Sequence, residues 1–123
     1  MQNEFVPYQP SLDMKELGFD KPCLTSYNEN GKIFKVWENE IVIGITKCSA
    51  PLYQQAFRWF REKYGLFAEI KPYLIIGTEW RYTITNRNNS SGLPYEEEFE
   101  TYEKAEIACL KKLIEIVKNQ TKN

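Results

Sequence analysis

The stretch APLYQQAFRWFREKYG, from Ala50 to Gly65, has the pattern of an amphipathic helix. Pro51 suits the first helical position, because its missing N–H would have no intrahelical partner there, and Gly65 suits the end. At about 100° per residue, the rings gather on one side and the arginines on the other. The apolar side holds Leu52, Tyr53, Ala56, Phe57, Trp59, Phe60 and Tyr64. The pattern therefore predicts a helix over residues 51–64 whose apolar side joins the core.

Rings interleaved with arginines are also typical of surfaces that bind nucleic acid, where rings stack on bases and guanidinium groups hold phosphates. Such a surface needs both kinds of side chain on one face, and here they point apart. A core helix with a solvated back is the favoured interpretation. Trp59 lies at the rim of the apolar side, so Trp59 and Arg58 are the residues of this helix nearest to a functional surface.

Two further helices are predicted. A short one over residues 12–17 has Ser11 as its cap and Gly18 after its end. A long one runs from Tyr102 to about Lys118, with Thr101 as its cap. An apolar stripe recurs along the long helix at helical spacing, while lysines gather on the opposite side, which indicates another core helix with a solvated back.

Six β-rich runs separate the helices, and their residue types favour strands. They are residues 23–28, 32–37, 40–46, 67–77, 80–87 and 94–101. Asn30-Gly31 predicts a hairpin between the first two runs, because both residues tolerate a positive φ. Pro72 marks an edge strand or a bulge, since proline cannot donate to a ladder.

The element order predicts an α+β fold of order α-βββα-βββα. We expect one antiparallel twisted sheet with the two longer helices on one face. Residues 1–123 are expected to form a single domain, with an irregular segment at 1–10 and a frayed end at 119–123.

The residue types exclude several kinds of chemistry. Histidine is absent, which removes the commonest general base and metal ligand. No phosphate-binding glycine loop, nucleophile elbow or EF-hand spacing occurs. The net charge of −1 argues against general affinity for nucleic acid, although a local basic patch is compatible with it. No cofactor and no metal are therefore expected, and an enzyme is disfavoured.

Two clusters have structural explanations. The three cysteines, Cys23, Cys48 and Cys109, are widely spaced and odd in number, so we expect buried, reduced thiols. The acidic run Glu96–Glu100 is interpreted as a solubilising strand edge or a protein contact, because adjacent glutamates on a strand point to opposite faces.

The first ten residues, MQNEFVPYQP, have neither the basic start nor the apolar core of a signal peptide. No window approaches the roughly 18 apolar residues of a membrane span. A cytoplasmic location without membrane contact is expected.

Three segments together resemble a family of small uncharacterised proteins encoded by phages and integrated mobile elements of anaerobic gut bacteria. The segments are KELGFDKPC (Lys15–Cys23), APLYQQAFRWFREKYGL (Ala50–Leu66) and FETYEKAEIACLKKLIEIVK (Phe99–Lys118). The resemblance implies an intracellular accessory protein that binds host or phage macromolecules. It brings no catalytic residues with it.

The favoured hypothesis is a non-enzymatic module that binds another protein or self-associates. One alternative is a nucleic-acid-binding protein that uses a local surface of arginines and aromatic residues. Lys71, Arg81 and Arg87 would form a basic strip if they shared the outer face of the sheet. A second alternative is a small-ligand binder or a carboxylate-based enzyme.

The sheet side is the expected binding surface, because its aromatic residues cannot all be buried under two helices. The candidates on the sheet are Trp37, Trp80, Tyr82, Tyr73 and Tyr95. Trp37 is the first choice, since it ends its strand just before the polar residues 38–40.

Overall fold

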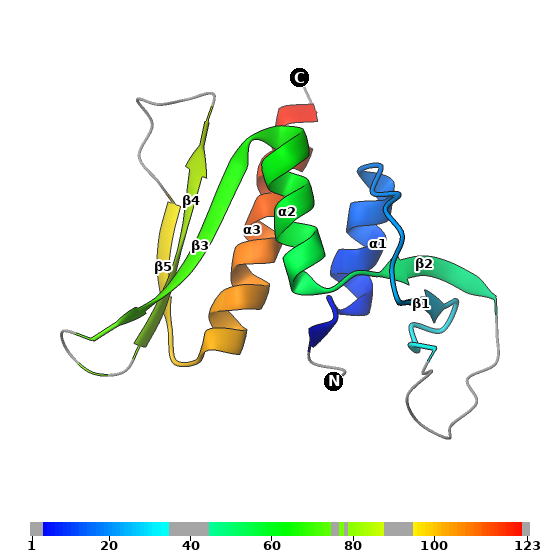
Figure 1. The fold of residues 1–123 in the computed structure, drawn as a ribbon, viewed down its shortest axis with the longest axis horizontal. Helices are drawn as coiled ribbons and strands as arrows, with labels where there is room; N and C mark the ends of the chain where they lie inside the picture. Colours follow the sequence, from blue (N-terminus) through cyan, green and yellow to red (C-terminus); the bar gives the residue numbers. More distant parts are fainter. Residues whose placement is uncertain (1–3, 35–44, 75–76, 78, 88–94, 122–123) are drawn as a thin grey trace. The chain divides into compact units, whose positions relative to one another are not determined.

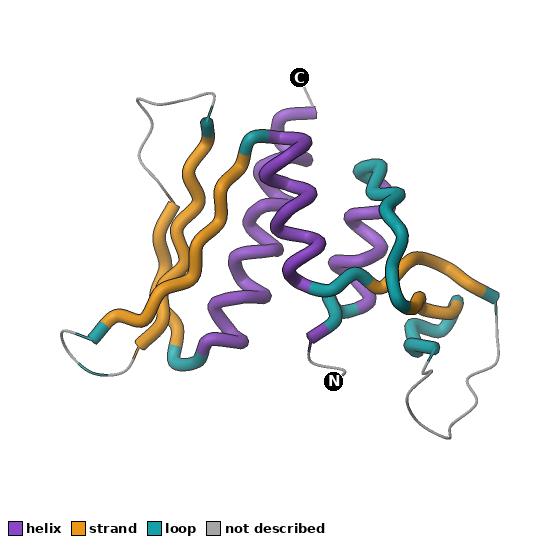
Figure 2. Tube along the Cα trace, in the orientation of Figure 1, coloured by secondary structure: helices purple, strands orange, loops and turns teal. Residues whose placement is uncertain are grey.

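The computed structural model describes residues 4–34, 45–74, 77, 79–87 and 95–121. Their order is α1 (Tyr8–Glu16), β1 (Thr25–Asn28), β2 (Thr46–Ala50), α2 (Tyr53–Tyr64), β3 (Leu66–Tyr73), β4 (Glu79–Asn86), β5 (Tyr95–Phe99) and α3 (Tyr102–Thr121) (Figure 1, Figure 2). The predicted α+β class is confirmed. The chain divides into two compact units, Met1–Ala56 and Phe57–Asn123, and the boundary falls within α2. Whether residues 1–123 unfold as a single domain stays a prediction.

Helix α1 begins four residues earlier than the sequence predicts, at Tyr8 instead of Leu12. Pro10 lies in its first turn, where the lack of an N–H breaks no helical hydrogen bond. Ser11 is therefore inside the helix, and its expected role as the cap is wrong. Its hydroxyl instead donates to the carbonyl of Val6, at 3.0 Å.

Gly18 follows the end of α1, as predicted. Gly18 has a φ of 101°, a left-handed conformation that glycine adopts without a steric cost. Its N–H donates to the carbonyl of Lys15, and the N–H of Phe19 donates to that of Met14. This is the Schellman arrangement, which satisfies carbonyls that the helix end would leave unpaired.

The predicted hairpin forms, and its loop is the segment 29–31 that lies between the predicted runs 23–28 and 32–37. The N–H of Asn28 donates to the carbonyl of Lys32, and Tyr27 bridges Ile33. Only Gly31 takes a positive φ in this loop, of 78°, so Asn30 is not left-handed as the two-residue turn would require. Instead, the Asn28 side chain organises the loop: Oδ1 accepts from the N–H groups of Asn30 and Lys32, at 2.9 Å each.

Strands β1 and β2 form a two-stranded antiparallel sheet in the first unit. Helix α1 packs against β2. Their apolar side chains form a cluster of Phe5, Tyr27, Ile33, Cys48 and Ala50, with Tyr8, Leu12 and Leu52 against it. The expected strand over residues 40–46 lies mostly outside the described residues. Ile45, expected on its apolar face, is 76% exposed.

Strands β3, β4 and β5 form a three-stranded antiparallel sheet in the second unit, with β4 in the middle. Helix α3 packs across all three strands, as Figure 1 shows. The prediction of three strands followed by a helix is confirmed for this half of the chain. Pro72 lies on β3, which is an edge strand, as its missing donor predicts.

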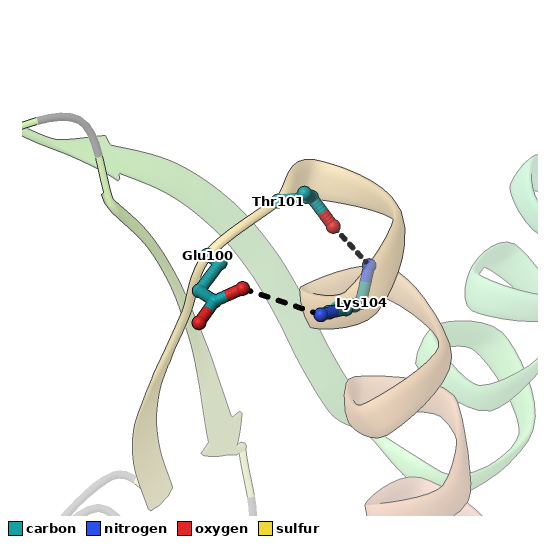
Figure 3. Close-up of polar contacts among 3 residues, drawn as sticks. All are labelled: Glu100, Thr101 and Lys104. Atoms are coloured by element: carbon teal, nitrogen blue, oxygen red, sulfur yellow. Dashed lines mark hydrogen bonds and ion pairs between the residues drawn. The ribbon is translucent and has the colours of Figure 1, made fainter.

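The start of α3 confirms Thr101 as the cap. The backbone N–H of Lys104 donates to Oγ1 of Thr101, at 3.1 Å, and Nζ of Lys104 lies 3.3 Å from a carboxylate oxygen of Glu100 (Figure 3). The cap satisfies one of the N–H groups that the first turn would leave without a partner.

One sheet covered by two long helices was expected, and this part of the prediction is wrong. Among the described residues, each unit has one small sheet. Each sheet is covered by a helix of its own unit, α1 on β2 and α3 on the three-stranded sheet. A helix of 20 residues is about 30 Å long, enough to cover strands of five to eight residues. The three-stranded sheet therefore needs no second helix to bury its apolar face.

The cysteines allow a direct chemical test of burial. Cys48 and Cys109 are buried, whereas Cys23 is half-buried, so complete burial of all three is wrong. Burial raises the pKa of all three thiols, for Cys109 to about 12. A raised pKa leaves little reactive thiolate at neutral pH.

We expect Cys48 and Cys109 to resist a thiol reagent at pH 7 in the folded protein, with Cys23 reacting slowly. All three should react at once in denaturant. Spectrophotometric counting of modified thiols, followed by peptide mapping, measures this directly. Rapid modification of Cys109 without denaturant would contradict the burial of this part of α3.

Candidate functional site on the three-stranded sheet

The three-stranded sheet has one face under α3 and one open face. Residues directly opposite each other on antiparallel strands share a face, and successive residues alternate. Tyr82 belongs to the face under α3, where its ring stacks on Phe99 with 5.9 Å between centroids. Trp80 is on the same side, edge to face with Tyr102 of α3 at 5.3 Å. The open face therefore carries Phe67, Glu69, Lys71 and Tyr73 of β3, Glu79, Arg81, Thr83 and Thr85 of β4, and Glu98 of β5.

Two of the predicted site residues are buried. Tyr82 is 2% exposed, and burial raises the pKa of its hydroxyl. Trp59 is 5% exposed, with its ring against Phe60 and Tyr64, so its expected partial exposure is wrong. Both rings are part of the packed interior, and neither can serve as a surface contact.

The other three predicted site residues differ in their outcomes. Trp80 is half-buried beside α3. Arg58 is exposed on α2, where its Nε lies 2.7 Å from a carboxylate oxygen of Glu62. Trp37 lies outside the described residues, and its role stays a prediction.

The open face instead brings together Tyr73, Arg81 and Glu98. The Arg81 guanidinium carbon lies 3.6 Å from the centre of the Tyr73 ring, a cation–π contact between neighbouring strands. The same guanidinium forms an ion pair with Glu98, which lies directly opposite Arg81 on β5. Arg81 is thus held from both sides at the middle of the sheet.

Glu79 adds a second carboxyl group to this cluster. A hydrogen bond with Glu98 and the like charge of that group raise the pKa of Glu79. Arg81 has the opposite effect on Glu98, whose pKa it lowers, with a further contribution from the hydrogen bond to Glu79. The two carboxyl groups share a proton more readily than isolated surface glutamates do, while Glu98 keeps its charge for Arg81.

Lys71 and Arg81 share the open face, as the predicted basic strip requires, but carboxylates lie beside both of them. Nζ of Lys71 lies 3.3 Å from a carboxylate oxygen of Glu69 on the same strand, and Arg81 pairs with Glu98. Each of these cations is therefore next to a carboxylate, which weakens any attraction for phosphates.

Metal and membrane sites were sought among the residues that the structure describes. In that part of the chain, no group of three or more cysteine, aspartate or glutamate side chains is arranged to hold a metal ion. No helix there has the length and apolar character to cross a membrane.

The aromatic residue in contact with Arg81 on the open face is Tyr73, one of several candidates that the sequence analysis names on the sheet. The signal that finds the open face is the alternation of Trp80, Tyr82 and Ile84 with Arg81, Thr83 and Thr85. The helix covers the first set, so the second set marks the open face. The alternation does not reveal Glu98 as the partner of Arg81, because that contact depends on the register between β4 and β5.

Comparison of the chain with protein-family models, with curated proteins and with solved structures found no match.

Proposed function

We propose that the protein is a non-enzymatic module that binds another protein through the open face of its three-stranded sheet. The observation that supports this is the Arg81 guanidinium stacked on Tyr73 and paired with Glu98 at the middle of that face. Arginine and tyrosine are enriched among residues that dominate binding energy at protein interfaces. An arginine already held in place loses little side-chain entropy on binding.

The charges on this face favour a protein over a nucleic acid as the partner. Glu69, Glu79 and Glu98 lie among the cations, so a phosphate backbone would meet carboxylates along the same surface. A protein surface of mixed charge can match both signs. Nucleic-acid binding remains the alternative, and salt-dependent gel shifts distinguish the two.

The cellular setting is part of the same proposal. The resemblance of three segments to phage and mobile-element proteins suggests an accessory role inside a bacterium. A partner would then be a host or phage protein.

The test compares two arginines that each pair with a glutamate but lie on different surfaces. Arg81 is on the open face, and Arg58 is on the exposed side of α2. Tagged wild-type protein, Arg81→Ala and Arg58→Ala would be used as baits in lysate of a bacterium that carries the gene. We expect Arg81→Ala to reduce the retained partner by about tenfold or more, and Arg58→Ala to retain it fully.

Circular dichroism should show the same melting behaviour for both variants before they are compared. Equal losses for both variants, or a loss for Arg58→Ala alone, would remove the open face from the proposal. No retained protein together with a salt-sensitive gel shift would favour the nucleic-acid alternative.

A further inference from the structure

The outer edge of β3 has backbone groups that no strand of its own sheet pairs. The N–H of Arg87 donates to the carbonyl of Gly65, at 2.8 Å, so residues 65 and 87 form a hydrogen-bonded pair. The register between β3 and β4 then runs without a shift from Leu66 to Tyr73. Hydrogen-bonded pairs alternate along an antiparallel ladder. Residues 66, 68, 70 and 72 therefore direct their backbone groups away from β4.

Pro72 agrees with this assignment. Its position belongs to the set directed outward, so its missing N–H leaves the ladder with β4 intact. The side chains around it are accessible: Glu69, Lys71, Pro72 and Leu74 are exposed, and Phe67 is 40% exposed.

We propose that this edge pairs with β3 of a second copy of the chain, antiparallel and with Ile70 opposite its own counterpart. The two sheets would join into one continuous sheet related by a two-fold axis through the Ile70 pair. Ile70 then exchanges both backbone hydrogen bonds with the partner's Ile70. The N–H of Ala68 donates to the carbonyl of the partner's Pro72, and the reciprocal bond forms on the other side of the axis.

Charge complementarity selects this register. With Ile70 at the centre, Glu69 lies opposite the partner's Lys71, and Lys71 lies opposite the partner's Glu69. Moving the axis by one residue would place Glu69 opposite the partner's Glu69, or Lys71 opposite the partner's Lys71. Like charges directly opposite each other destabilise a strand pair, so both neighbouring registers are disfavoured.

The existing sheet adds a reason for Lys71 to accept a second carboxylate. The residue directly opposite Lys71 is Arg81 on β4, which has a like charge and lies on the same face. Glu98 lies on the far side of Arg81, so the row across the sheet reads Glu98, Arg81, Lys71. The partner's Glu69 would place a carboxylate at the other end of this row.

The remaining pairs in this register also match in size and character. Phe67 lies opposite the partner's Tyr73, and aromatic pairs across strands are favourable. Ala68, with the smallest side chain of β3, lies opposite the ring of the partner's Pro72. Because proline has no N–H, the hydrogen bond from residue 72 to the carbonyl of the partner's Ala68 does not form, and the same bond is missing on the other side of the axis.

The dimer forms through outward backbone groups of β3, whereas the proposed partner site centres on Arg81 of β4, so this inference does not rest on the proposed function. The two share only open-face side chains of β3. A chain that remains monomeric could still bind another protein through Arg81 and Tyr73. A chain that dimerises through β3 could still lack any other partner.

The test uses charge reversal at Glu69 and Lys71. Sedimentation equilibrium of the full chain, from micromolar to millimolar concentration, should show a monomer–dimer equilibrium for the wild type. Lys71→Glu and Glu69→Lys each place like charges opposite each other twice in the dimer. We expect each variant alone to dimerise at least about tenfold more weakly.

Two further samples restore opposite charges at the 69–71 pairs across the interface. The double variant Glu69→Lys/Lys71→Glu again pairs opposite charges with its own copy and should dimerise like the wild type. An equimolar mixture of Lys71→Glu with Glu69→Lys should form mixed dimers, because every 69–71 pair across the interface then has opposite charges. A wild type that stays monomeric throughout would overturn the proposal. Dimers that the single reversals leave unchanged would overturn it as well.

Discussion

Replacing Phe60 with alanine is expected to lower the free energy of unfolding by about 3–5 kcal/mol. The ring is completely buried, at 0% exposure, and lies against Trp59 and Tyr64 with centroid distances of 5.0 and 6.0 Å. Truncation removes the apolar area of the ring from the interior and leaves a cavity that the neighbouring rings fill only in part. Chemical denaturation followed by tryptophan fluorescence measures the loss.

Phe67→Ala is the matched control for this substitution. Phe67 lies on the open face of the sheet and is 40% exposed, so less area returns to water when the ring is removed. We expect a loss below about 1.5 kcal/mol, measured at a concentration where copies do not associate. Similar losses for the two variants would mean that the apolar side of α2 is not packed as the structure has it, and that its rings are available for binding.

Asn28→Ala, in the first unit, is expected to lower the free energy of unfolding by about 2–4 kcal/mol. Asn28 is 1% exposed, and its Oδ1 accepts from the N–H groups of both Asn30 and Lys32. Alanine removes this acceptor, and both N–H groups then lose their hydrogen-bond partner in a partly buried turn. Because the side chain sets the path of the loop, the pairing of Tyr27 with Ile33 should weaken with it.

Asn30→Ala provides the same chemical change in the same turn. The Asn30 side chain is exposed, and only its backbone N–H takes part in the bond to Asn28. A change within about 0.5 kcal/mol is expected. If Asn30→Ala is as costly as Asn28→Ala, the intrinsic turn preference of asparagine, and not the buried acceptor, holds the loop.

The second half of the chain was the more predictable part, because its signals are local and agree with one another. The alternation around Tyr82 predicts a strand with one buried face, Pro72 an edge, and Thr101 a helix start. The observed strands β3, β4 and β5 lie within the predicted runs, apart from a residue at the start of β3 and of β4. Each of these features depends on a few neighbouring residues, which is the range over which sequence patterns carry information.

The first half was less predictable because its packing uses small residues. Strand β2, with the sequence TKCSA, buries only Cys48 and Ala50, which give a weak alternation signal. The sequence therefore predicts no strand over residues 47–50, and it starts the next helix at Pro51, two residues before α2 begins at Tyr53. The early start of α1 has a different cause. Pro10 predicts an irregular segment over residues 1–10, whereas in the structure it lies in the first turn of the helix, where its missing N–H breaks no hydrogen bond.

For the candidate site, the sequence predicts which residues lie on the open face of the sheet but not which of them are in contact. Alternation separates Arg81 from Tyr82, but the contact of Arg81 with Tyr73 and Glu98 requires the register of three strands. The choice of Tyr82 as a surface residue failed because a sheet with one covered face buries the aromatic set and exposes the charged one.

The short strand β5 limits how far sheets of this protein can grow. It forms the edge opposite β3 and carries Glu97 and Glu98, both exposed, in a strand of only five residues. Two such edges would bring carboxylates together, so one end of the sheet resists the addition of further strands. Any assembly that begins at β3 therefore closes after a pair and does not continue into a fibre, a form of protection against aggregation that uses charge where other proteins use a covering loop.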